Sequence, residues 1–319
     1  MGVVTAASGR DGRERNDPGF HQCWFPVALS AEIGGDAVIG RDFLGTRIVV
    51  YRDPAGRAVV QSAWCPHLGA DLSVGQMADG QLRCAYHHWR FDGAGRCVHI
   101  PSGDRIPPAA RVFTYPNAEA WGLVWAFNGR TPLFDVPHIP DAEEGELLFE
   151  AHRRGERSLD PWVAVSNGVD FQHLRTLHGM PETAFPATLE VGDHAIDYSV
   201  TTPDYAQRGR ITGTNCFAQH IRIGADDMFM LFAGAPIAHG RAMGYYVFGV
   251  PKPASAADAP AQRGKLAALH AMVTRLNEED AVVLNTIRFR RGTLTASDRH
   301  LARYLKYVDQ FPLAPPPEA

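Results

Sequence analysis

Short runs of β-branched and aromatic residues, separated by turn residues, fill most of the first 130 positions of the chain. The clearest runs are 47–53, 58–64, 111–116 and 122–129. The first two are joined by a DPAG segment, in which proline and glycine are typical of a tight turn. Short strands with close turns predict a small all-β domain over residues 20–135. The polar, glycine-rich segment 1–19 is expected to be flexible.

The pattern changes after position 130. Segment 131–161 is rich in proline and acidic residues, which is typical of a crossing between domains. Beyond it, we expect strands over 188–200, 209–223, 227–237 and 242–251 and helices over 161–181 and 262–291. The chain is therefore predicted to be α+β, with a second domain over residues 136–319. Its last residues, 314–319, are expected to be frayed.

Composition limits the class, partners and cellular location that we expect for the protein. The 319 residues are enough for two domains, and the 45% hydrophobic and 21% charged residues are typical of a soluble globular protein. A net charge of −4 gives no reason to expect nucleic acid or an anionic membrane as a partner. We find neither a signal peptide nor a membrane-spanning apolar run, so a cytoplasmic location is expected. Cys23, Cys97 and Cys216 are widely separated, as free thiols in a reducing compartment would be.

Four potential metal ligands lie close together between Trp64 and Trp89. Cys65 and His67 are spaced C-x-H, and Cys84 and His87 follow sixteen residues later with C-x-x-H spacing. Two thiolates and two imidazoles suit zinc, or a [2Fe–2S] cluster in which two histidines bind one iron. The tight C-x-H spacing favours the cluster, because each of two loop tips would then supply one ligand to each iron.

A second group of potential ligands lies at Asp170, His173 and His178. Two histidines and a carboxylate form the facial triad of non-haem Fe(II) oxygenases, which leaves coordination positions open. On a straight helix, the two histidines would point about 140° apart, too far for one metal ion. The helix is therefore expected to end or distort just before His178, and Gly179 and Pro181 provide the means.

The third iron ligand is expected on the helix predicted over 262–291, where Asp280 falls on an apolar stripe. The stripe consists of Leu269, Met272, Val273, Leu276, Val283, Leu284 and Ile287. A carboxylate on a buried face requires a compensating charge, which iron would supply. Glu279 is the second candidate. In the alternative interpretation, Asn277 caps a new helix and Asp280 is solvated at its third position.

The segments CPHLGA and CAYHHWRFDGAGRCVHIP resemble the Rieske domain of Rieske-type non-haem iron oxygenases. The resemblance implies that Cys65, His67, Cys84 and His87 bind a [2Fe–2S] cluster. His88 stands where the family usually has glycine.

The Asp-x-x-His-x-x-x-x-His segment also matches this family, in its alpha subunits without a separate β subunit. By resemblance, His173, His178 and Asp280 bind a mononuclear Fe(II). Asp170 would link the cluster-binding histidine of a neighbouring subunit to His173, and Asn167 would line the iron pocket.

The resemblance further implies a catalytic domain with an antiparallel sheet wrapped around a long helix (a helix-grip fold), and a head-to-tail homotrimer. The expected function is that of a terminal oxygenase, which uses O2 to hydroxylate or oxidatively demethylate a small organic substrate. Electrons would come from NAD(P)H through a separate flavin/iron–sulfur reductase, with or without a ferredoxin. The alternatives are a cis-dihydroxylating dioxygenase of an aromatic substrate, or an electron-transfer protein with a non-catalytic iron site. Candidate pocket residues are Met228, Met230, Phe232 and Phe248.

Overall fold

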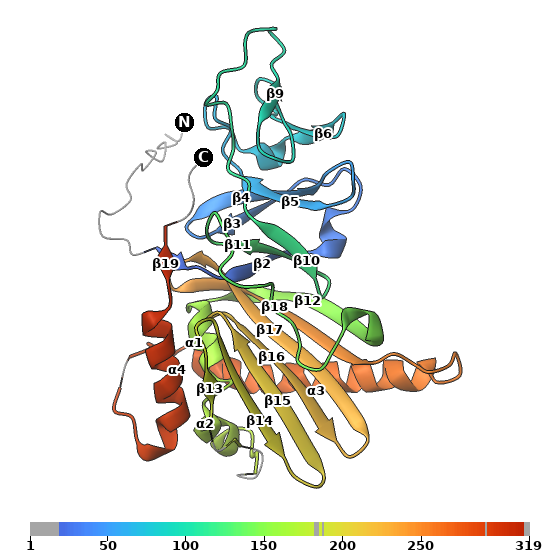
Figure 1. Cartoon of the computed structure of the whole chain (residues 1–319), viewed down its shortest axis with the longest axis vertical. Helices are drawn as coiled ribbons and strands as arrows, with labels where there is room; N and C mark the ends of the chain where they lie inside the picture. Colours follow the sequence, from blue (N-terminus) through green and yellow to red (C-terminus); the bar gives the residue numbers. More distant parts are fainter. Residues whose placement is uncertain (1–18, 182–184, 187, 291, 316–319) are drawn as a thin grey trace, which may run out of the picture.

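A computed structural model describes residues 19–181, 185–186, 188–290 and 292–315 of the chain. The segment predicted to be flexible, 1–19, lies outside the described residues except for Gly19. The described part consists of five antiparallel sheets and four α-helices (Figure 1).

Three small antiparallel sheets are built from the first 130 residues, as the short strand patterns predicted. One contains β2 (Trp24–Leu29), β10 (Asn117–Ala120) and β11 (Leu123–Phe127); the second contains β3 (Ile39–Phe43), β4 (Thr46–Arg52) and β5 (Ala58–Ser62). The third contains β6 (Gln76–Ala78), β7 (Gln81–Arg83), β8 (Arg90–Phe91) and β9 (Cys97–His99). In Figure 1, this third sheet lies at the end of the molecule farthest from helix α2 (Phe171–Thr176).

A seven-stranded antiparallel sheet forms most of the remaining chain, in the order β12-β18-β17-β16-β15-β14-β13. Its strands are β12 (Leu147–Arg157), β13 (Glu190–Val191), β14 (Ala195–Thr201), β15 (Tyr205–Thr212), β16 (Cys216–Ile223), β17 (Asp226–Ala238) and β18 (Arg241–Pro251). Helix α3 (Ala259–Leu284) crosses one face of this sheet (Figure 1). It buries Leu266, Leu269 and Val273 against Met230 and Phe248 of the sheet. This arrangement matches the sheet and long helix expected from the family resemblance.

The two parts of the chain share one hydrophobic core. Phe25 and Trp125 from the small sheets belong to the same buried cluster as Leu231 and Tyr245 from the large sheet. Helix α4 (Arg299–Gln310) adds Tyr304, Leu305, Tyr307 and Val308 to this core. The proposed boundary between 135 and 136 thus lies within a continuously packed structure, and it remains a prediction.

The ends of the described chain pair with each other. Strand β1 (Phe20–His21) forms a two-stranded antiparallel sheet with β19 (Leu313–Ala314). Ala314, which was expected to be frayed, is therefore part of a strand, whereas residues 316–319 lie outside the described residues.

Several predicted elements differ from the structure. Segment 111–116 forms isolated bridges instead of a strand, and segment 188–200 is a hairpin of β13 and β14 instead of one strand. The helix predicted over 262–291 ends at Leu284. Segment 161–181 is not one helix but two, α1 (Pro161–Ser166) and α2, separated by a turn. Segment 209–223 is a hairpin, because β15 ends at Thr212 and Gly213 adopts a φ of +60°. Segment 131–161, expected to be a crossing, contains the edge strand β12.

Candidate metal centres

The four cysteine and histidine residues of the first predicted site lie on two turns of the same shape. In the first turn, Gly69 N–H donates to the carbonyl of Cys65 at 2.8 Å; in the second, His88 N–H donates to the carbonyl of Cys84 at 3.1 Å. Gly69 and His88 occupy equivalent positions, and both have positive φ, +74° and +57°. A positive φ favours glycine, so this geometry agrees with the glycine that the family resemblance predicts at position 88 and makes His88 an unfavourable replacement.

The side chains of the two turns converge. Cys65 and Cys84 are buried, whereas His67 is partly buried and His87 is exposed. The imidazole centroids of His67 and His87 are 4.5 Å apart, and His67 stacks on Trp89 at 4.5 Å with the ring planes 8° apart. Two thiols therefore lie inside the fold, and two imidazoles lie at its surface.

This donor set fits a [2Fe–2S] cluster. Burial and the neighbouring Cys84 thiol raise the pKa of Cys65 to about 11, so two thiolates at this position require a metal centre to stabilise them. The Nδ1 atom of His67 is buried and has no hydrogen-bond partner among the described residues. A buried polar atom without a partner is unfavourable, and coordination would satisfy it. Cys23, Cys97 and Cys216 are free thiols, as predicted.

His173 and His178 come together because helix α2 ends early. The helix stops at Thr176, and Gly179 has a φ of +68°, which confirms the predicted end before His178. The two imidazole centroids are 5.3 Å apart with the rings nearly perpendicular.

Asp280 reaches these histidines from the far end of α3. Its Oδ1 atom lies 3.0 Å from Nε2 of His178 and 3.7 Å from Nε2 of His173. The potential ligand atoms of the three residues all lie within 4.8 Å of one another. The chain thus brings together the two histidines and the carboxylate that the sequence singled out.

The Nδ1 atoms of the two imidazoles, which are the outer nitrogens of the site, form hydrogen bonds with other groups. Nδ1 of His178 donates to Glu279 Oε2 at 2.9 Å, and Nδ1 of His173 donates to the main-chain carbonyl of Asp170 at 2.6 Å. In a neutral imidazole, each Nε2 then carries a lone pair that faces Asp280, and a metal cation between them would make this contact favourable. Nε2 of His173 is also buried without a hydrogen-bond partner in the described residues. The site therefore fits a divalent metal ion.

The same contacts separate Asp280 from Glu279. Asp280 faces the inner nitrogens of both histidines, whereas Glu279 binds the outer nitrogen of His178 and also contacts Arg275 at 3.3 Å. The geometry therefore favours Asp280 as the ligand. The alternative in which Asn277 caps a new helix is wrong, because α3 continues through it and its Oδ1 accepts from Tyr246 Oη at 2.9 Å.

Asp170 was predicted to lie on a helix face, but in the structure it caps the N-terminus of α2. Its carboxylate Oδ1 accepts from the His173 main-chain N–H at 3.1 Å. It meets the His173 imidazole through its carbonyl rather than through its carboxylate. Asn167 caps the C-terminus of α1 with its backbone N–H. The electron-transfer role of Asp170 and the pocket role of Asn167 remain predictions.

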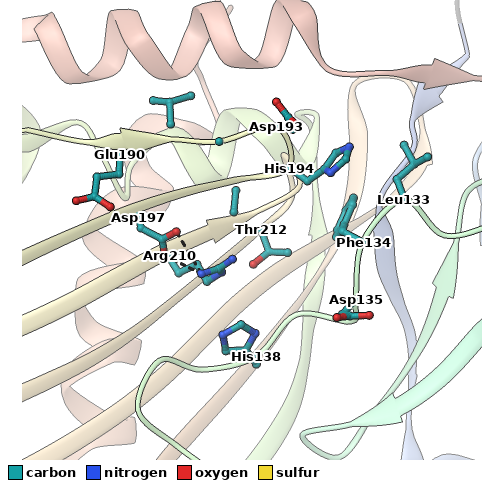
Figure 2. A pocket seen from close by; sticks show the side chains of 13 residues that line it. Leu133, Phe134, Asp135, His138, Glu190, Asp193, His194, Asp197, Arg210 and Thr212 are labelled. Carbon is teal, nitrogen blue, oxygen red and sulfur yellow. Dashed lines mark hydrogen bonds and ion pairs between the residues drawn. The ribbon is translucent and has the colours of Figure 1, made fainter.

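A large cavity lies elsewhere. It has a volume of about 910 Å³ and lies between strands β13–β15 and the segment around Phe134 (Figure 2). His138, His194 and an ion pair between Arg210 and Asp197 at 3.0 Å face it. None of the residues of the two metal centres lines it, and no pattern in the sequence predicted a cavity at this place.

Comparisons with known proteins agree with this geometry. A family model described as a Rieske [2Fe-2S] domain matches residues 23–116. The oxygenase component of dicamba O-demethylase from Stenotrophomonas maltophilia is 39% identical over 160 residues, covering 49% of this chain and 46% of the relative. The oxygenase subunit of 3-chlorobenzoate-3,4-dioxygenase from Comamonas testosteroni is 29% identical over 227 residues, covering 67% and 50%.

The solved structure of NdmB from Pseudomonas putida is similar with a TM-score of 0.76 and 19% identity, covering 89% of each chain. The matches span about half of the length of the two curated relatives. The chain therefore contains a Rieske [2Fe-2S] domain, is similar in sequence to an oxygenase component and an oxygenase subunit over about half of their length, and has a fold similar to that of NdmB. In the described part of the chain, no helix combines the length and apolar character needed to span a membrane.

Proposed function

We propose that this protein is the terminal oxygenase of a multicomponent system, which uses O2 and externally supplied electrons to hydroxylate or oxidatively demethylate a small organic substrate. The observation that carries the proposal is a second candidate metal centre, His173, His178 and Asp280, in a chain that also contains a Rieske domain. A protein that only transfers electrons would need the cluster alone.

In this proposal, Cys65, His67, Cys84 and His87 hold the cluster, and the second centre holds Fe(II). When bound, the cluster supplies single electrons and the iron activates O2. The protein's part is to hold the iron ligands in place before any metal enters. Glu279 and the Asp170 carbonyl do so by fixing which nitrogen of each imidazole carries the proton.

Asp170 is proposed to connect the two kinds of centre across a subunit boundary. Its Oδ1 atom already caps α2 beside His173. The Oδ2 atom would accept a hydrogen bond from the cluster-binding His87 of a neighbouring subunit. An Asp170→Asn variant keeps a good capping side chain but loses the charge, so it should retain both metals and lose coupled turnover.

The substrate is proposed to bind between the large sheet and α3. Met228, Met230, Phe232 and Phe248 lie there, and they support an apolar substrate. The hydrogen bond between Tyr246 and Asn277 offers polar groups at the same place, one helical turn from Asp280. A small aromatic or similarly apolar molecule with a polar substituent fits these groups best.

The electron source is proposed to be a separate reductase that oxidises NAD(P)H, with or without a ferredoxin. Relatives named as an oxygenase component and an oxygenase subunit support this division of labour.

Metal analysis tests the proposal first. Iron and acid-labile sulfide should be measured on anaerobically prepared protein, with electron paramagnetic resonance after reduction. About three irons to two sulfides, with a Rieske signal, is expected for a cluster plus one iron. Two irons to two sulfides, unchanged after addition of Fe(II), would favour electron transfer instead.

A second candidate is dioxygenation, which the 3-chlorobenzoate-3,4-dioxygenase relative supports. Turnover under ¹⁸O2 separates the two reactions. Monooxygenation should place one labelled oxygen atom in the products derived from the substrate, and cis-dihydroxylation should place two.

A further inference from the structure

A second group of two histidines and a carboxylate lies away from the iron site. Glu150 and His152 are on the edge strand β12, and His270 is on α3. Glu150 and His152 are two residues apart, so their side chains leave the strand on the same face. Helix α3 packs over that face and brings His270 to them.

The three side chains converge closely. Glu150 Oε2 lies 3.3 Å from His152 Nε2 and 4.0 Å from His270 Nδ1, and the two imidazole centroids are 4.4 Å apart. The potential ligand atoms all lie within 4.8 Å of one another. In a tetrahedral site with bonds of 2.0–2.1 Å, ligand atoms are roughly 3.4 Å apart. The Glu150–His152 distance matches this value, the Glu150–His270 distance is longer by less than 1 Å, and the distance between the ligand nitrogens of the two histidines is within 4.8 Å.

The surroundings suit a metal site at the edge of the core. Phe248 is almost fully buried and lies directly opposite Glu150 in the strand register. Its ring centroid is 5.1 Å from that of His270 and 6.0 Å from that of His152, so it forms an apolar floor. Above the floor, Glu150 and His270 line a cavity of about 650 Å³. A bound ion would therefore keep coordination positions open to small ligands.

From this geometry, we propose that Glu150, His152 and His270 form a second divalent-metal site, suited to zinc and similar borderline ions. Two imidazoles and one carboxylate favour such ions over calcium or magnesium, which require mainly oxygen ligands. The site is separate from the iron centre, because His270 precedes Asp280 by ten residues, roughly 15 Å along α3. The proposal does not rest on the proposed oxygenase function.

Zinc binding to the cluster- and iron-loaded protein tests the proposal. Equilibrium dialysis against Zn²⁺, with zinc and iron measured together, should show one additional zinc per chain and no loss of iron. X-ray absorption at the zinc edge should show two imidazole ligands. Calcium at the same concentration should not compete.

Matched variants test whether the zinc binds at Glu150, His152 and His270. His152→Gln and His270→Gln should each weaken zinc binding at least about tenfold. Glu278→Gln, which changes an exposed carboxylate on the same cavity, should leave it unchanged. Thermal midpoints check that the variants fold. The proposal is overturned if zinc enters only as iron leaves, if no zinc binds, or if both histidine variants bind it normally.

Discussion

At the scale of single residues, the two cluster turns differ at one informative position. Gly69 and His88 have the same left-handed backbone, but only His88 has a side chain to strain it. That conformation costs a non-glycine residue roughly 1–2 kcal/mol, partly offset by the greater chain entropy that glycine loses on folding. We predict that His88→Gly raises the free energy of unfolding by about 0.5–1 kcal/mol. Denaturant unfolding measures this change.

The same variant identifies the cluster ligand. His87, not His88, has its ring beside His67, so His88→Gly should keep the visible absorption of the cluster and His87→Ala should lose it. Gly69→Ala is the matched control for the change in stability. It places a side chain at the equivalent position of the other turn and should lower the free energy of unfolding. If His88→Gly lost the absorption, His88 would be the ligand.

Glu279 and Asp280 offer a second test at this scale. Glu279 binds the outer nitrogen of His178, so Glu279→Gln should weaken Fe(II) binding about 10- to 100-fold without abolishing it. Asp280→Ala should remove most of the mononuclear iron. Competition with a chelator measures both affinities, and Glu278→Gln serves as a neighbouring control. The opposite ranking of the two variants would make Glu279 the iron ligand.

At the scale of elements, the pairing of β1 with β19 contains a buried titratable group. His21 on β1 shares a hydrogen bond with Thr214 Oγ1 at 2.8 Å, and burial lowers the pKa of its imidazole to about 4. In the unfolded chain, that pKa is close to 6.5. Below pH 6.5, the unfolded state therefore takes up the proton first, and stability falls until about pH 4, by about 3 kcal/mol in total. Above pH 6.5, His21 contributes no pH dependence.

His21→Gln removes this titration. Urea unfolding at pH 7.5 and pH 5, at equal protein concentration, should show that the loss of stability between these values is about 2 kcal/mol smaller in the variant. Equal losses in the two proteins would mean that His21 is not responsible.

The elements also show what the sequence could predict. Strands β4, β5 and β11 follow from their β-branched runs and turn residues, and the end of α2 follows from Gly179 and Pro181. The break between α1 and α2 was missed because no proline lies between Pro161 and Pro181, although Asn167-Gly168 is a turn signal at that place. Asp170 supplies the capping carboxylate there, and a cap is hard to distinguish from an ordinary helix position.

The residues of the candidate site could be predicted where their spacing along the sequence determines the geometry. They could not be predicted where contacts between distant parts of the chain determine it. Asp280 was found from its place on an apolar stripe, of which Leu269 and Val273 are buried as expected, whereas Met272 is exposed. The prediction that the second half of the stripe is also buried is wrong, since Val283 and Ile287 are exposed. Glu279 as the partner of His178 could not be predicted, because that contact joins residues 101 positions apart.

At the scale of the whole molecule, exposed apolar side chains gather beside each metal centre. Trp64, Leu68 and Tyr86 are exposed on the cluster turns, and Leu177 and Val282 are exposed next to the ligands of the iron site. In Figure 1, the sheet of β6–β9 and helix α2, which lie close in sequence to the two groups, are at opposite ends of the molecule. Two different apolar surfaces on one chain suit a head-to-tail contact that closes into a ring, as the proposed homotrimer requires.

Subunit mixing tests that arrangement through its chemistry. His87→Ala should lack a working cluster, and Asp280→Ala should lack a working iron site, so each variant alone should be inactive. In a mixed head-to-tail ring, an intact cluster can face an intact iron site of the next chain. Random mixing makes about a quarter of the contacts productive, so co-expression should restore about a quarter of the wild-type rate. If each cluster served the iron of its own chain, the mixture would stay as inactive as its parts.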